Sequence, residues 1–462
     1  MVGGLGSIVG ARRFCSAAVE RDGQLGPRPR NRGVVSSSSG PSTREGEVGV
    51  RTVKVVLAML SFALAHGACA AEFHWYKGNT HTHTINSDGD ASPDTVVRWY
   101  REHGYHFLFI TDHEYVTDPA PLNALFGASE RFLILPGQEI TQWGADPARS
   151  SAHVNSLFTT QVIWPMGKRT CAGGSCGATV DASVPLAVAF KTNIAAVIAA
   201  NGIAQINHPN YRWSVKPEDL YAVPNGCLFE VWNGQGHINN LGGTDDEGDT
   251  RPSTEGFWDI LLSRGKVIWG VGSDDSHNFG PTAEPHVADP GRAWIMVRAP
   301  ELTHKAVEAA LRRGDFYAST GITLDEIAVN HTTMRELKEP HHQPLSSNVE
   351  KGEEPSRPAH FPSNLSKLGK MEGARVSGKI EAPKAGDRFS FSIAEKIHGA
   401  SRYLTRFIGR DGKVLAEVAG THPTYRIKGA EQYVRASIID SNGNRAWTQP
   451  VFLDGRSDSA AP

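Results

Sequence analysis

Between Phe73 and about Gly321 the sequence alternates short apolar runs with amphipathic segments. The apolar runs predict strands at 73–83, 106–110, 132–138, 153–158, 203–207, 227–233, 267–273 and 293–298. Between them, apolar residues at helical spacing predict helices from Ser92 to Gly104, at Pro185–Ala200, at Thr254–Arg264 and at Glu301–Arg313. Strands and helices that alternate over this length predict an α/β fold and favour a barrel over residues 72–325.

The last part of the chain has a different pattern. Residues 335–372 are rich in Pro, Ser, Lys and His, which is typical of a linker or a long loop. Polar and apolar residues then alternate in the segments Ala374–Ile380, Arg388–Ile393, Tyr403–Gly409, Lys413–Val418, Tyr433–Ile439 and Ala446–Leu453. We therefore expect a small β-sandwich domain over residues 373–462.

The first 71 residues read as a leader that is removed from the folded protein. Residues 1–50 are rich in Gly, Arg, Ser and Pro, without an apolar period, and are expected to be disordered. Residues 51–71 combine basic residues, the apolar run Val55–Ala65 and a small-residue stretch, as a signal peptide does. We expect cleavage near Ala70, a secreted or periplasmic protein, and no membrane span after cleavage. A buried helix is the alternative interpretation of the apolar run.

Composition and charge narrow the class of partner. The chain has 462 residues, of which 39% are hydrophobic and 21% charged, as in an ordinary globular protein. Its formal net charge is −2, and beyond residue 70 it is about −7, so no basic field favours a nucleic acid. We expect a small-molecule substrate, and the oligomeric state stays open. Cys171 and Cys176 flank a Gly-rich loop and are able to form a disulfide in an oxidising compartment.

Nine residues that can bind metals follow the predicted strands or lie at their ends. They are His81, His83, Asp88, His113, Glu139, His153, His208, Asp275 and His277. In a barrel, side chains at the carboxyl ends of the strands converge on one face, where active sites form. Six histidines and three carboxylates supply the mixed nitrogen and oxygen ligands that zinc, manganese or iron favour. The pattern therefore predicts a centre for two or three divalent metal ions.

The order of these residues resembles the polymerase and histidinol phosphatase (PHP) domain family over roughly residues 75–321. The matching segments are His81-Thr82-His83, Asp88-Gly89, Thr111-Asp112-His113, Glu139, His153, Asn207-His208-Pro209 and Asp275-Ser276-His277. The sequence also resembles the branch of that family that contains carbaryl-type ester hydrolases. The resemblance implies a distorted seven-stranded α/β barrel that holds two or three metals.

The resemblance also implies how the ligands are shared among the metals. His81, His83, Glu139 and Asp275 would hold one metal. Glu139 would bridge to a second metal, which His153 and His208 also hold. A third metal would be bound by Asp88, His113 and His277. Some members of the family have His where this chain has Asp88, so the occupancy of this third site is the weakest part of the assignment. Asp274 is an alternative to Asp275, although the D-x-H spacing favours Asp275.

The expected reaction is hydrolysis by a metal-activated hydroxide, with Asp112, Glu139 and His277 as the candidate catalytic residues. Asp112 would orient a ligand or donate a proton, and a carboxylate that caps a loop is the equal alternative. Three divalent ions against three carboxylates leave a positive site, which favours a phosphate ester. Two ions would leave a site closer to neutral, which suits a carboxylic ester or a carbamate.

Other functions stay open at this level. A non-catalytic metal-binding or surface-binding protein is one alternative, although all nine ligand positions are filled. An amidohydrolase-type deaminase would usually need a bridging lysine, and no lysine lies between His83 and His153. The sequence from Gly173 to Gly177 fits the G-x-S-x-G pattern by chance, since a polar segment precedes it. His237 follows a predicted strand and either lines a substrate pocket or lies on the surface.

Overall fold

The computed structural model describes residues 72–144, 151–172, 175–180, 183–280, 288–330, 332–333, 382–395 and 402–456. The expected leader (1–50), signal peptide (51–71) and linker (335–372) lie outside these residues, as does the expected strand Ala374–Ile380. Within the described part of the chain, no helix has both the length and the apolar character needed to cross a membrane.

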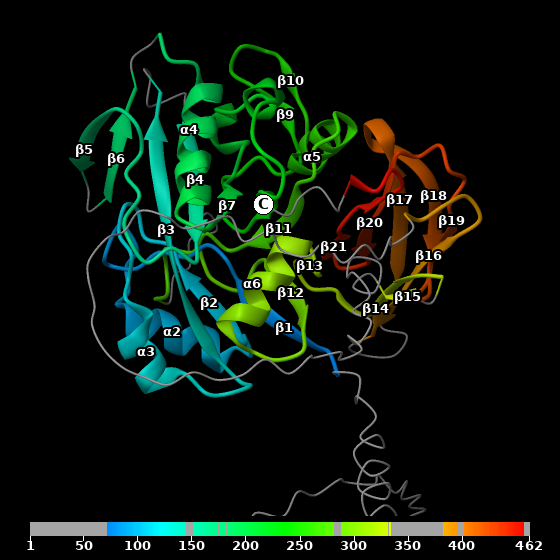
Figure 1. The fold of residues 1–462 in the computed structure, drawn as a ribbon, viewed down its shortest axis with the longest axis horizontal. Coiled ribbons are helices and arrows are strands. Elements are labelled where there is room, and N and C mark those ends of the chain that lie inside the picture. The colour runs from blue at the N-terminus through cyan, green and yellow to red at the C-terminus, as the bar shows by residue number, and fades with distance from the viewer. Residues whose placement is uncertain are drawn as a thin grey trace, which may run out of the picture. The chain divides into compact units, whose positions relative to one another are not determined.

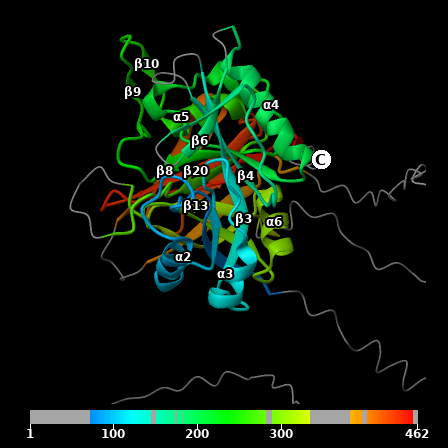
Figure 2. The same ribbon diagram turned by 90° about the vertical axis from the view of Figure 1, so that its left-hand side faces the viewer.

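Helix α2 (Pro93–Glu102) shows why the expected helices form. Proline occupies its first turn, and Gly104 lies just past its end with a φ of 74°. Val96, Val97 and Tyr100 fall on one face of the helix and are fully buried. They pack with residues of the second and third strands, and Figures 1 and 2 show α2 beside α3 at this side of the sheet.

The other long helices are close to the expected ranges, and one helix was not expected. The confirmed helices are α4 (Leu186–Ala199), α5 (Thr254–Ser263) and α6 (His304–Arg313). The helix missing from the sequence analysis is α3 (Pro119–Phe126), in which the Asp118 side chain accepts a hydrogen bond from the backbone N–H of Ala120. An Asp-Pro pair before a short apolar segment is a helix start signal, so this helix was detectable.

All eight strands expected in the first region are present. They are β1 (His74–Asn79), β2 (Phe107–Ile110), β3 (Leu133–Trp143), β4 (Ser151–Leu157), β7 (Ile203–Ile206), β8 (Leu228–Asn233), β11 (Trp269–Ser273) and β12 (Trp294–Ala299). With β13 (Phe316–Ser319) they follow the order β11-β8-β7-β4-β3-β2-β1-β12-β13 in one large sheet. The expected α/β class is thus confirmed as a mixed sheet with a few helices packed against it.

The sheet is not parallel throughout, in contrast to an ideal barrel. β1, β2 and β3 are parallel, as are β7, β8 and β11, whereas β4 runs antiparallel to both of its neighbours. Only seven residues separate the end of β3 from the start of β4. Because a parallel crossover needs about a dozen residues or more, this connection forces the antiparallel pairing.

The chain segments that follow β1 and β11 are hydrogen-bonded to each other. Thr82 and Ser276 form an isolated parallel bridge. The N–H of His83 donates to the carbonyl of Ser276 at 2.9 Å, and the N–H of Asp275 donates to the carbonyl of His81 at 2.9 Å. No ladder between β1 and β11 is formed in the described residues, so the closed barrel stays a prediction. These bonds do bring the two metal-ligand segments side by side.

The C-terminal strands pair with the earlier part of the chain. Those expected from the sequence are β16 (Arg388–Ala394), β17 (Tyr403–Gly409), β18 (Lys413–Ala419), β20 (Tyr433–Asp440), β21 (Arg445–Thr448) and β22 (Val451–Phe452). β21 pairs with β13 and extends the large sheet through β20 to β17 and β18. A second sheet has the order β15-β14-β16-β19, with β14 (Thr323–Val329), β15 (Thr332–Thr333) and β19 (Thr424–Arg426). Each of the two sheets therefore contains strands from both expected domains. The boundaries of these domains stay predictions.

A buried ion-pair cluster fixes α5 against β20. Arg435 is fully buried, and its Nε and Nη2 lie 2.8 and 2.5 Å from the two carboxylate oxygens of Asp259. Its Nη1 lies 2.8 Å from Glu255 Oε1, and the hydroxyl of Tyr433 donates to Asp259 at 2.8 Å. Trp258 packs against the guanidinium, with its ring 5.0 Å away. Every charge in this cluster has a partner, as burial away from water requires.

Candidate metal centre

The structure brings all nine predicted ligand residues together. His81 and His83 follow β1, His113 follows β2, His208 follows β7, and Asp275 and His277 follow β11. Glu139 and His153 differ from the expectation, because they lie within β3 and β4 rather than at strand ends. In that antiparallel pair Thr141 is opposite His153, so Glu139 is its diagonal neighbour on the same face.

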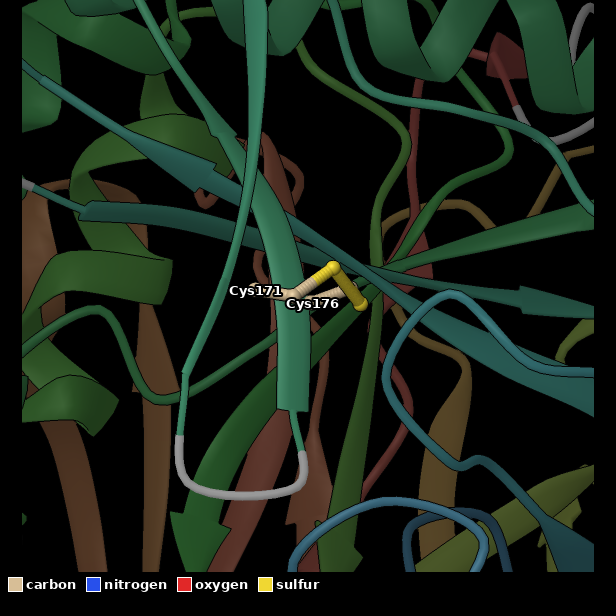
Figure 3. Close-up of a disulfide and its surroundings, with 2 residues drawn as sticks. All are labelled: Cys171 and Cys176. Atoms are coloured by element: carbon tan, nitrogen blue, oxygen red, sulfur yellow. A yellow bond between two sulfur atoms is a disulfide. The ribbon is translucent and has the colours of Figure 1, made fainter.

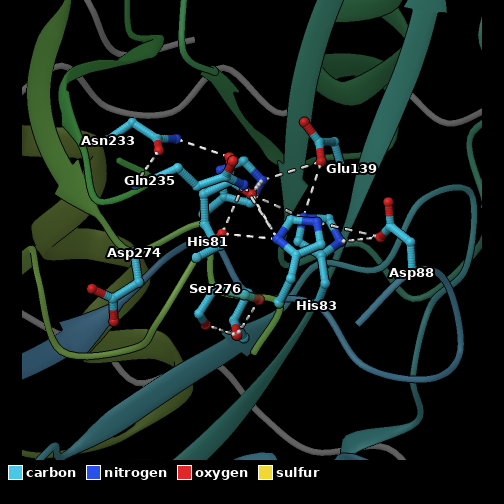
Figure 4. Close-up of polar contacts among 12 residues, drawn as sticks. His81, His83, Asp88, Glu139, Asn233, Gln235, Asp274 and Ser276 are labelled. Atoms are coloured by element: carbon cyan, nitrogen blue, oxygen red, sulfur yellow. Dashed lines mark hydrogen bonds and ion pairs between the residues drawn. The ribbon is translucent and has the colours of Figure 1, made fainter. Parts of the chain in front are cut away.

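Glu139 is the hub of the cluster, and its two carboxylate oxygens face different histidines. Figure 4 shows its carboxylate beside His81 and His83. Oε2 lies 3.1 Å from His81 Nε2, 3.2 Å from His83 Nε2 and 3.4 Å from His113 Nδ1. Oε1 lies 3.0 Å from His153 Nδ1 and 3.3 Å from His208 Nε2. A buried carboxylate shared among five imidazoles is positioned to bridge two cations.

Asp275 completes one group of possible ligands. Its Oδ1 lies 3.3 Å from Nε2 of both His81 and His83, and its Oδ2 lies 3.8 Å from His208 Nε2. One ligand atom from each of His81, His83, Glu139 and Asp275 falls within 4.8 Å of the others. This is the same set that the sequence assigns to the first metal.

Asp88 gathers a second group at the more exposed side. Its Oδ1 lies 3.5 Å from His83 Nδ1 and 3.4 Å from His277 Nε2, while its Oδ2 lies 3.4 Å from His113 Nε2. A third group consists of His113, Glu139 and His153. His208 approaches Glu139 but belongs to none of the three groups, so the exact division of ligands among metals stays a prediction.

Two further observations indicate that the donor set suits divalent cations. His153 Nε2 is buried and has no hydrogen-bond partner, which costs about 1–3 kcal/mol unless a cation or another group satisfies it. Burial also lowers the pKa of His153 to about 4, so the imidazole is neutral and free to bind a metal. For His81, burial is outweighed by the Asp275, Glu139 and Glu230 carboxylates, which raise its pKa. The same negative field attracts a metal cation.

Glu230 is a functional residue that the sequence analysis missed. It lies on β8, is fully buried, and its Oε1 is 2.7 Å from His81 Nδ1. The Ser273 hydroxyl donates to Oε1 at 2.5 Å, and the N–H of His208 donates to Oε2 at 2.6 Å. A carboxylate behind a ligand histidine fixes its ring and tautomer. The signal was a lone acidic residue inside the apolar strand 227–233.

Replacing Glu230 by glutamine is expected to weaken metal binding by about 10–100-fold, because His81 loses its charged partner and the new amide faces other donors. Metal titration of the metal-free protein measures the effect. The same change at Glu326, which is exposed on β14, should leave the affinity unchanged. Equal affinity for both variants would contradict the positioning role of Glu230.

Asp112, which precedes the predicted ligand His113, is held by hydrogen bonds from neighbouring loop residues. Asp112 is fully buried and accepts hydrogen bonds from the Thr84 N–H and hydroxyl, the Ser87 hydroxyl and the Thr117 hydroxyl. This geometry fits the loop-capping alternative, and a catalytic role for Asp112 stays a prediction.

Asp274 accepts hydrogen bonds from the backbone N–H groups of residues 291–293 and points away from the histidines (Figure 4). Asp275, not Asp274, therefore faces the cluster.

A cavity of about 430 Å³ opens onto the cluster, which is within the usual range for small-molecule sites of roughly 300–1,000 Å³. Its lining combines predicted ligands with other side chains: Asp88, His113, Glu139, His153, His208, Asp275, His277, Trp143, Thr170, Cys176, Gly177, Tyr211, Gln235, His237 and Ile238. His237 is thus a pocket residue, which was one of the two interpretations from the sequence.

One wall of the cavity is a hairpin that was not expected. It consists of β5 (Lys168–Ala172) and β6 (Ser175–Thr179), and β6 pairs with β3. Cys171 and Cys176 are opposite each other in the hairpin and form the disulfide that the sequence allowed (Figure 3). At Gly177 a Cβ would lie 2.8 Å from the carbonyl oxygen of Thr141, so only glycine lets the hairpin pack this closely. The G-x-S-x-G match is part of this hairpin and no nucleophile elbow.

Comparisons with known proteins give similarities to solved structures at low sequence identity. No family model matches the sequence, and no curated protein matches it. A two-domain protein from Bacteroides vulgatus, described as containing a PHP-like metal-dependent phosphoesterase, is 14% identical with a TM-score of 0.37, over 79% of this chain and 90% of that chain. A candidate metal-dependent phosphoesterase from Bifidobacterium adolescentis is 16% identical with a TM-score of 0.28, over 46% and 92%.

A third solved structure is an amidohydrolase from Chromobacterium violaceum, with bound sulfate and no metal. It is 14% identical to this chain with a TM-score of 0.27, over 46% of this chain and 93% of that chain. The carbaryl-type branch expected from the sequence finds no support among these structures.

Proposed function

We propose that the protein is a PHP-type metal-dependent hydrolase that cleaves a small phosphate ester. The observation that carries this proposal is the convergence of six histidines on Asp88, Glu139 and Asp275 at the base of one cavity. Bound there, divalent ions would lower the pKa of a coordinated water and neutralise charge on the substrate. Zinc, manganese and iron all suit this donor set.

The chain's own residues contribute position and charge. Glu139 and Asp275 hold the buried imidazoles of His81 and His83 in one orientation, and Glu230 supports His81 from behind. Ordered ligands of this kind keep the reacting groups in place, so little reorganisation is needed during the reaction.

The balance of charge favours a phosphate ester over a neutral ester. Four carboxylates contact the imidazoles, namely Asp88, Glu139, Asp275 and Glu230. Burial raises the pKa of Glu114 to about 9, so this neighbouring carboxyl adds no charge at neutral pH. With three divalent ions bound, six positive charges would exceed these four negative charges, and the resulting positive site would suit an anionic substrate.

Export from the cytoplasm remains part of the proposal. The Cys171–Cys176 disulfide supports it, because such bonds persist mainly in oxidising compartments. The partner that we propose is a small-molecule phosphate ester of a size that the 430 Å³ cavity can hold.

The proposal is tested by assaying the full chain with Mn²⁺ or Zn²⁺ against phosphomonoesters, phosphodiesters and aryl carboxylic esters. We expect turnover of phosphate esters that a chelator removes and added metal restores. Turnover of the carboxylic esters alone would contradict the choice of substrate class. Turnover that survives complete removal of metal would contradict the metal mechanism.

A further inference from the structure

The loop that follows β8 has a fixed conformation at the cavity. The backbone N–H of Asn233 donates to Asn240 Oδ1 at 3.1 Å, and Asn240 Nδ2 donates to the carbonyl of Asn233 at 2.8 Å, which closes the loop at its base. Inside the loop, the N–H of Gln235 donates to Asn233 Oδ1 at 2.9 Å. The loop presents Gln235, His237 and Ile238 to the cavity.

The same loop is bonded to the candidate metal centre (Figure 4). Asn233 Nδ2 donates to Asp275 Oδ2 at 3.0 Å and to Glu230 Oε2 at 2.9 Å. Gln235 Nε2 donates to the carbonyl of Asp275 at 2.9 Å and lies 3.2 Å from His277 Nδ1. The position of His237 relative to the centre is therefore set by hydrogen bonds rather than by a free loop.

His237 differs from the six predicted ligand histidines. Each of those six lies within 3.5 Å of a carboxylate oxygen. His237 instead packs edge-on against Tyr211, with ring centroids 5.6 Å apart, and Tyr211 packs in the same way against His208 at 5.4 Å. His237 is exposed and lines the cavity, so a substrate in the cavity can reach it.

We propose that His237 is a catalytic residue that donates a proton to the leaving oxygen of the substrate, a role that rests on the proposed phosphoesterase function. The oxygen of a water molecule forms a new bond to phosphorus, and the bond from phosphorus to the leaving oxygen breaks with its electron pair. That oxygen takes the proton of His237, which reacts in its protonated form although burial lowers the pKa of its imidazole. A proton of the attacking water passes to solvent, and His237 is protonated again from solvent before the next turnover.

The role is tested with His237→Gln, since glutamine keeps a polar side chain of similar length but transfers no proton. The full chain with Mn²⁺ is assayed on phenyl phosphate and on 4-nitrophenyl phosphate, which share the aryl phosphate core but differ in leaving group. Phenol is a poor leaving group and depends on protonation, whereas nitrophenol does not. We expect kcat/KM for phenyl phosphate to fall by at least about 100-fold and that for 4-nitrophenyl phosphate by less than about 10-fold.

The control is His422→Gln, the same change at an exposed histidine outside the cavity, which should alter neither substrate. Metal content should stay that of the unmodified protein. An equal fall for both substrates would mean that His237 only packs or binds, and would overturn the catalytic role. If the unmodified protein hydrolyses neither phosphate while it hydrolyses carboxylic esters, the proposed function fails instead, so the two failures are distinguishable.

Discussion

Replacing Glu139 by glutamine is expected to lower kcat/KM by more than about 100-fold and to remove most of the bound metal. Replacing a residue that only hydrogen-bonds to a metal ligand lowers metal affinity or activity by about 10–100-fold. Glu139 lies at the centre of the donor set, so we expect a larger effect. Its two oxygens lie within 3.4 Å of five imidazole nitrogens, on two sides of the carboxylate. Glutamine would remove the negative charge and place an NH₂ group where one of these oxygens was.

Elemental analysis and the phosphate-ester assay together measure this result. Glu326→Gln makes the same chemical change on the exposed side of β14 and should leave metal content and rate unchanged. Thermal unfolding of the metal-free proteins separates loss of metal from loss of folding. A Glu139→Gln protein that keeps both its metal and its activity would be incompatible with the bridging role of this residue.

Replacing Arg435 by methionine is expected to lower the free energy of unfolding by about 3–5 kcal/mol, because the buried carboxylate of Asp259 and the partly buried carboxylate of Glu255 then lose their cation. Asp259 keeps only the hydroxyl of Tyr433 among the contacts described above, and Glu255 loses its bond at 2.8 Å. Methionine fills much of the space of the arginine stem, so the effect comes mainly from the unpaired charges rather than from a cavity.

Urea unfolding measures this loss as a lower midpoint with an unchanged slope. The matched control is Arg406→Met, which breaks the ion pair of Arg406 with Glu417, in which both side chains are about half exposed. Exposed pairs contribute about 0–1 kcal/mol, so this variant should unfold close to the unmodified protein. Similar midpoints for the two variants would show that the buried cluster is not a major source of stability.

The sequence predicted those parts of the molecule whose signal is local. Apolar runs of strand length, a proline at the start of α2 and a glycine after its end are present within a few residues of chain. The ligand residues were visible because most of them adjoin such apolar runs. Their convergence then follows from the geometry of neighbouring strand ends.

What the sequence did not predict depends on contacts between distant segments. The β5–β6 hairpin has a polar, glycine-rich sequence without a hydrophobic period, and it pairs with β3 and is closed by a disulfide. Glu230 has a role only because His81, distant in sequence, lies beside it. The pairing of β21 with β13 likewise joins segments that sequence patterns describe separately.

Gln449 covers the backbone of β11 at a point just before the ligand segment. Its Oε1 accepts from the N–H of Gly270 at 2.8 Å, and its Nε2 donates to the carbonyl of the same residue at 2.7 Å. A side-chain amide thus satisfies a backbone group much as a neighbouring strand would. Exposed strand backbone recruits other chains and leads to aggregation. The Gln449 side chain therefore pairs one backbone position of β11, and a protein cut before residue 449 would leave the N–H and carbonyl of Gly270 without this partner.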